Sequence, residues 1–77
     1  KNYSLKTVNV PKKVKTIQCG TFENCVNLKK DNMKSVTSIE RRAFCGDKKL
    51  KKVKLNKKVK VGKKAFLFTK VKGQKTT

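Results

Sequence analysis

The chain has 77 residues, of which 23 are Lys or Arg and only 4 are Asp or Glu, so its formal net charge at pH 7 is +19. A chain of this length fits one small domain with a modest core or a piece of a larger one, and the excess of positive charge attracts polyanions. It contains no His and no Trp, which removes the commonest general base and the commonest imidazole metal ligand, and no apolar stretch approaches the roughly 20 residues that span a bilayer.

The first third of the chain, residues 5–27, reads LKTVNVPKKVKTIQCGTFENCVN. Leu5, Val8 and Val10 predict an opening strand. Pro11 follows at a point where a turn is needed and no N–H donor is required. A second extended piece is expected over residues 14–17, and the Thr-Phe pair after it predicts a tight turn or a single helical turn.

The other two thirds, residues 28–49 and 50–71, repeat this pattern as LKKDNMKSVTSIERRAFCGDKK and LKKVKLNKKVKVGKKAFLFTKV. The positions that recur are Leu5, Leu28 and Leu50, then Ile17, Ile39 and Val61, and finally Phe22, Phe44 and Phe66. No single unit can bury its apolar side alone, but stacked units can, so the sequence predicts a solenoid of about three coils. Phe68 is expected to cover the open end of the last coil, and residues 72–77 are expected to form a frayed tail.

The repeat has two single-residue deletions, which we call slips, and one charged residue at an inward position. The second unit lacks one residue between Leu28 and Val36, and the third lacks one between Val59 and Val61. Both losses are expected in turns, because a lost strand residue would turn every later side chain to the other face. Asp31 occupies an inward position, where a carboxylate is costly unless it is paired, and lysines are plentiful nearby.

As a set, these residues resemble the BspA-type leucine-rich repeat, whose unit of roughly 22 to 23 residues runs LxxIxIPxxVxxIGxxAFxxC. The matching positions are Leu5, Val8, Val10, Pro11, Val14, Ile17, Phe22 and Cys25 in unit one, Leu28, Val36, Ile39, Ala43 and Phe44 in unit two, and Leu50, Val53, Leu55, Val59, Val61, Gly62, Ala65 and Phe66 in unit three. The family proline is present only at Pro11, the family cysteine only at Cys25 and the family glycine only at Gly62. Such degenerate units are typical of a short array or of the terminal part of a longer one.

The resemblance implies a right-handed leucine-rich repeat solenoid, mostly β with short helical or 3-10 turns. It also implies an extracellular or cell-surface protein of bacteria or protists that acts in adhesion or protein binding and is not an enzyme. The residues agree with the absence of catalysis, since the four carboxylates form no close pair in sequence and no nucleophile, base or metal ligands are assembled. We therefore predict no catalytic residue, no cofactor and no metal.

The three cysteines, Cys19, Cys25 and Cys45, include no CxxC spacing. A zinc site would need a carboxylate as its fourth ligand, because the chain has no His. Buried or half-buried free thiols are the favoured interpretation. One disulfide with a spare thiol is the alternative, and Cys25 to Cys45 is a conceivable pair because both follow the phenylalanine of their unit.

The repeat register predicts columns of lysine on the outward side of the opening strands. These columns contain Lys6, Lys29 and Lys51, then Thr7, Lys30 and Lys52, and then Asn9, Asn32 and Lys54. Two further basic clusters are expected at turns. In one, Lys12 and Lys13 lie near Lys57 and Lys58, and in the other Arg41 and Arg42 lie near Lys63 and Lys64. The residues predicted to contact a partner are Lys29, Lys30, Lys51, Lys52, Lys54, Arg41, Arg42, Lys63 and Lys64.

The sequence supports more than one interpretation of this charge. The first is an interaction module that binds a protein or an acidic glycan or other polyanion, and the second is a lysine-rich surface that is merely solvated. A non-specific nucleic-acid-binding domain is an alternative, although only two of the cations are Arg and no recognition motif is present. A cationic membrane-active protein is a further alternative, but it would require an amphipathic helix in place of the coil repeat. Ligand identity, flanking repeats, cysteine pairing and oligomeric state stay open.

Overall fold

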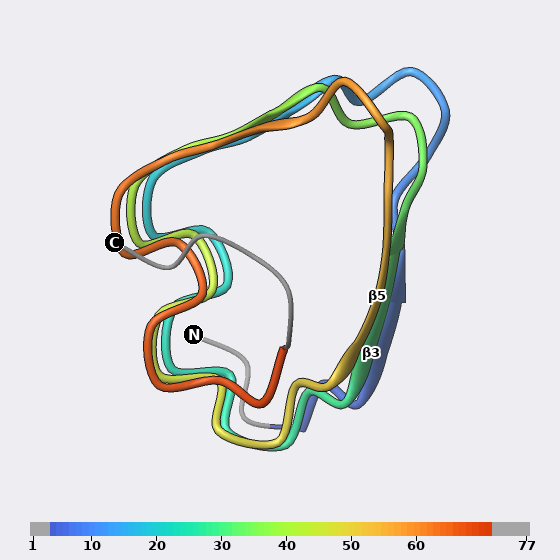
Figure 1. Ribbon diagram of the computed structural model, residues 1–77. Coiled ribbons are helices and arrows are strands. Elements are labelled where there is room, and N and C mark those ends of the chain that lie inside the picture. The colour runs from blue at the N-terminus through green and yellow to red at the C-terminus, as the bar shows by residue number, and fades with distance from the viewer. Residues whose placement is uncertain (1–3, 72–77) are drawn as a thin grey trace.

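The computed structural model describes residues 4–71, which wind through three coils that lie over one another (Figure 1). Each coil contributes one strand to each of two sheets. The first set of strands is β1 (Thr7–Asn9), β3 (Lys30–Met33) and β5 (Lys52–Leu55), and the second is β2 (Thr16–Ile17), β4 (Ser38–Ile39) and β6 (Lys60–Val61). Within residues 4–71 the remaining backbone is turn and loop without helix, so the Thr/Ala-Phe segments take the tight-turn alternative.

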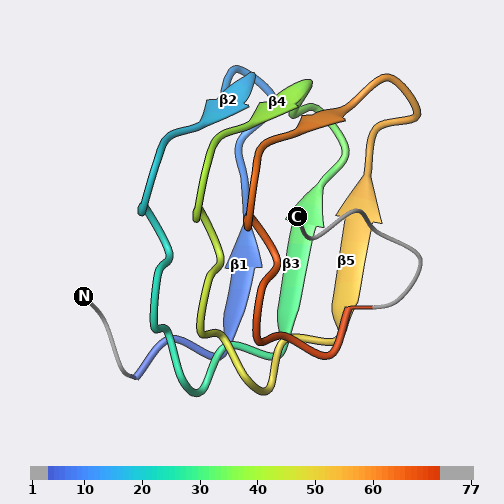
Figure 2. The same cartoon turned by 60° about the vertical axis from the view of Figure 1, so that its left-hand side comes forward.

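Both sheets are parallel, because every coil passes through each of them in the same direction (Figure 2). In the first sheet Thr7 pairs with Lys30 and Lys30 with Lys52, as the predicted columns require. In the second sheet Ile17 pairs with Ile39, and Ile39 with Val61. These registers confirm the predicted leucine-rich repeat solenoid of three coils.

The two slips fall outside the strands, as expected. Each coil turns between its two strands through a backbone hydrogen bond, from Val14 to Pro11, from Val36 to Met33 and from Val59 to Asn56. In the third coil one residue fewer separates this turn from the second strand. Asn56 replaces the proline and supports its turn differently, because its Oδ1 accepts the Lys58 N–H at 2.8 Å and its Nδ2 donates to the Lys34 carbonyl at 2.9 Å.

The core is a ladder of equivalent residues from successive coils. Leu28 and Leu50 are fully buried, and Phe44 and Phe66 are at most 1% exposed. Phe22, Phe44 and Phe66 stack with ring centroids 5.2 Å apart at each step and interplanar angles of 11° and 4°. Stacked rings at this separation add to the burial energy, so one aromatic column holds all three coils together.

Two positions in each coil adopt left-handed backbone conformations. One column contains Gly20 (φ 72°), Arg42 (φ 59°) and Lys64 (φ 61°), and the other contains Asn24 (φ 59°), Gly46 (φ 84°) and Phe68 (φ 62°). The carbonyls of the first column accept the N–H three residues later, which closes the turn around the phenylalanine. Phe68 does not cover the last coil as expected, because this turn leaves its side chain 72% exposed.

Two further expectations concern the interior. The favoured interpretation of buried thiols is confirmed for Cys25 and Cys45, whereas Cys19 is exposed, and the alternative Cys25–Cys45 disulfide does not form. Asp31 is buried as expected, but no lysine pairs with it: neither carboxylate oxygen has a hydrogen-bond partner in the described structure. The expected tail at residues 72–77 lies outside the described residues.

Candidate binding face

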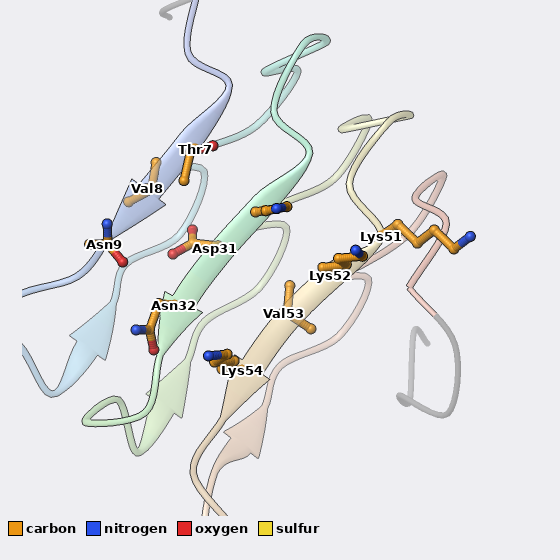
Figure 3. Close-up of a pocket in the computed structure, with 10 residues that line it drawn as sticks. Thr7, Val8, Asn9, Asp31, Asn32, Lys51, Lys52, Val53 and Lys54 are labelled. Carbon is orange, nitrogen blue, oxygen red and sulfur yellow. The ribbon is translucent and has the colours of Figure 1, made fainter.

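The outward side of the first sheet carries six polar side chains, which we call the strand face and which form two rows of three that run from coil to coil. They are Thr7 and Asn9 from β1, Lys30 and Asn32 from β3, and Lys52 and Lys54 from β5. Figure 3 labels all of them except Lys30. They face outward because side chains alternate along a strand, and Val8, Asp31 and Val53 take the intervening inward positions. The same alternation that fills the core therefore builds this surface.

The strand face borders a shallow hollow of about 440 Å³ that runs across β1, β3 and β5. A second hollow of about 410 Å³ lies beside it. The side chains that line the second hollow are Lys29, Lys30, Lys49, Lys51, Lys52 and Lys70. The two hollows share Lys30, Lys51 and Lys52, so the five lysines of the opening strands that were predicted to contact a partner lie around one continuous surface.

Positive charge increases across the strand face from the first coil to the third. The outward residues are uncharged on β1, one lysine and one asparagine on β3, and two lysines on β5. Adjacent parallel strands lie about 4.8 Å apart, so Lys30 and Lys52 are direct neighbours. An anionic group placed between β3 and β5 would relieve their mutual repulsion.

The four remaining predicted contacts lie elsewhere on the coil. Arg41 and Arg42 follow β4, and Lys63 and Lys64 follow β6, in the turns beyond the second sheet. The structure brings these two turns together as predicted, because the Arg42 N–H donates to the Lys63 carbonyl at 3.2 Å. The nine predicted residues thus form two separate basic clusters.

Beneath the surface lie two carboxylates, of which the sequence pattern drew attention only to Asp31. Asp31 is 2% exposed and Asp47 is fully buried. The Asp47 Oδ1 accepts the Cys25 N–H at 2.7 Å, while its other oxygen has no partner within residues 4–71. Asp47 lies 22 residues after Cys25, so it occupies the position that the family cysteine fills in unit one. This repeat spacing could have predicted that Asp47 is buried.

Burial changes the protonation of both groups. Desolvation raises the pKa of Asp31 from 3.8 to about 7. Burial likewise raises the pKa of Asp47 to about 7, against the opposing effect of the Cys25 hydrogen bond and with smaller contributions from Asp31 and Glu23. Among the described residues no group of three or more Cys, Asp or Glu side chains is arranged to hold a metal ion.

Comparison with protein families adds one decisive finding. The family described as "BspA type leucine rich repeat region (6 copies)" matches residues 1–76, which is nearly the whole chain. The chain belongs to this family. No curated protein and no solved structure matches it.

Membership of the BspA-type family indicates the general kind of protein. Leucine-rich repeats of this family are typically non-enzymatic interaction modules, and solenoids present binding surfaces along their stacked units. In the part of the chain that the structure describes, no helix has the length and apolar character needed to cross a bilayer.

Proposed function

We propose that this BspA-type repeat domain is a non-enzymatic interaction module that binds an acidic partner through its strand face, in an adhesion role outside the cell or at its surface. The proposal depends chiefly on one observation: Lys29, Lys30, Lys51, Lys52 and Lys54 gather around adjoining hollows of the first sheet. Lysine is a strongly hydrated point charge and favours diffuse attraction over bidentate recognition. An acidic polymer or surface is therefore the expected class of partner.

The positions of the carboxylates support this proposal. Asp31 and Asp47 are buried, and Glu23 and Glu40 lie in or beside the turns that follow the second sheet. Asp31 borders the hollow of the strand face but is only 2% exposed, so in the described structure no exposed acidic side chain stands among these lysines. Their field extends into solvent and would speed the encounter with an oppositely charged partner.

A charge-matched pair of variants tests whether the strand face is the binding surface. The first variant combines Lys30→Gln, Lys52→Gln and Lys54→Gln, and the control combines Lys12→Gln, Lys57→Gln and Lys58→Gln at exposed turn residues. Both variants lose three positive charges, so an attraction that depended only on net charge would give them the same loss of affinity. In heparin titrations at low salt we expect the face variant to lose about 10-fold or more in affinity and the control about 2- to 3-fold.

Equal losses in the two variants would contradict the assignment of the strand face. If the parent protein does not bind heparin even at low ionic strength, the lysines serve solubility and the partner is not an acidic one. Binding should also fall steeply with added salt in the parent protein, because surface charges are screened beyond about 10 Å at 0.1 M salt.

A further inference from the structure

We infer that the ligand of the strand face is an anionic polysaccharide, a sugar chain that carries sulfate or carboxylate groups and lies across β1, β3 and β5. This inference rests on the proposed function, because it names the class of acidic partner that the same face would take.

The strand face offers hydrogen-bond acceptors as well as donors. Thr7, Asn9 and Asn32 are outward-facing members of the rows that end in Lys52 and Lys54 (Figure 3). An asparagine side chain donates through its NH₂ and accepts through its oxygen, and a threonine hydroxyl also does both. Within residues 4–71 no hydrogen bond occupies the side-chain amide of Asn9 or Asn32.

A ligand that matches this face needs donors of its own. Phosphodiester and carboxylate groups only accept hydrogen bonds, so a DNA backbone would satisfy the lysines and leave the Asn and Thr oxygens to water. A polyglutamate chain could reach those oxygens only through its peptide N–H groups, because its side chains donate none. Sugar hydroxyls donate and accept. A sugar chain with acidic substituents would therefore pair its hydroxyls with β1 and β3 and its charges with β5.

The face lacks what the competing classes of partner ordinarily use. Single-stranded nucleic acids stack their bases on aromatic side chains, and protein partners anchor aromatic or apolar groups in pockets. The side chains that face outward from β1, β3 and β5 are Thr, Asn and Lys alone. Phe22, Phe44 and Phe66 belong to the core stack, and Phe68 lies beyond the second sheet.

The direction of the ligand follows from the rows. Equivalent side chains repeat about every 4.8 Å from one coil to the next, perpendicular to the strands. A linear polymer lying along the rows meets Thr7, Lys30 and Lys52 on one side and Asn9, Asn32 and Lys54 on the other. It thus passes from an uncharged hydrogen-bonding end to a purely cationic end.

The test compares heparin with a thymidine oligonucleotide and with polyglutamate of equal charge, titrated into the full chain at one salt concentration. We expect heparin to bind at least about 5-fold more tightly than either. We also expect the uncharged double variant Asn9→Ala with Asn32→Ala to lose about 3- to 10-fold in heparin affinity while its oligonucleotide affinity changes less than about 2-fold. Asn9→Ala alone, at an exposed position, should show part of this loss without any effect on folding.

The outcomes separate this inference from the proposed function. If heparin and the other polymers bind alike and the asparagine variants change nothing, the polysaccharide inference is overturned while the acidic-partner proposal stands. Tighter binding of the oligonucleotide or of polyglutamate would also overturn it, in favour of a nucleic acid or an acidic protein. If the Lys30, Lys52 and Lys54 variant binds all three polymers like its charge-matched control, the proposed function itself fails.

Discussion

Asp31 occupies the column that Val8 and Val53 fill in the neighbouring coils, yet its carboxylate is 2% exposed and accepts no hydrogen bond within the described structure. Burial disfavours the charged form and raises its pKa from 3.8 to about 7. Because the folded-state pKa exceeds the unfolded one, the folded protein binds the proton more tightly. Stability is then greatest in acid and decreases as the pH rises from about 4 to about 7, by a few kcal/mol at about 1.4 kcal/mol for each pKa unit.

We therefore predict that Asp31→Val raises the free energy of unfolding near neutral pH and reduces its dependence on pH. Urea unfolding at about pH 4, about pH 5.5 and about pH 8 measures both effects. Part of the slope should persist in this variant, since burial also raises the pKa of Asp47 to about 7. The matched control is Glu40→Gln, which removes an exposed carboxylate and should keep the parent slope. A parent protein equally stable at all three pH values would refute the argument.

At the scale of the elements, the contact between coils two and three depends on Gly62. Its N–H donates to the Ile39 carbonyl at 2.7 Å, which brings the two backbones together. A Cβ at this position would lie 2.7 Å from the Arg41 backbone nitrogen and 2.9 Å from the Glu40 carbonyl carbon. Gly62 has no left-handed φ, so this conflict is purely steric.

We expect Gly62→Ala to separate β6 from β4 and to lower the free energy of unfolding by about 1–3 kcal/mol, as overpacking typically does. Urea unfolding followed by circular dichroism gives the value. Lys63→Ala serves as the control, because it alters the adjacent exposed residue without adding an atom to the contact. Stability of the glycine variant equal to that of the control would mean that the coils move apart at negligible cost.

The elements were largely predictable from the sequence because the coils share one hydrophobic ladder. Equal spacing of Phe22, Phe44 and Phe66 in sequence becomes equal spacing of stacked rings, so the repeat gave the fold, the registers and the sites of the slips. The interior electrostatics were less predictable. An aspartate at an inward position predicts a positively charged partner, but no described lysine pairs with Asp31. The sequence pattern did not draw attention to Asp47 at all.

At the scale of the whole molecule, the sequence predicted which lysines share a row but not where the surface is hollow. Rows follow from strand register alone, and the pairing of Lys30 with Lys52 bears this out. The hollows depend on the packing of neighbouring side chains and on turns such as the one that brings Lys70 beside Lys51. The identity of the ligand decides which basic cluster contacts it, and the sequence does not give that identity. The contact residues therefore stay a prediction.

The same rows set the response of the whole protein to salt. With a net charge of +19 and lysine beside lysine along β3 and β5, folding brings like charges together. Each exposed neighbouring pair costs under about 1 kcal/mol, and screening shortens the range of repulsion from about 30 Å at 0.01 M salt to about 3 Å at 1 M. We predict that sodium chloride raises the urea midpoint over this range, and that it does so less in the Lys30, Lys52 and Lys54 variant.

Heparin should reproduce this stabilisation at low salt, because a ligand that binds the folded rows shifts unfolding by mass action. The two effects should not add: at high salt the rows are already screened, so heparin should bind weakly and raise the urea midpoint little. A urea midpoint that does not respond to sodium chloride would show that the lysines splay far enough to avoid one another. In that case the lysines of the two rows would not repel one another, and an anionic chain would gain nothing by separating them. Any stabilisation by heparin would then have to come from hydrogen bonds to Thr7, Asn9 and Asn32.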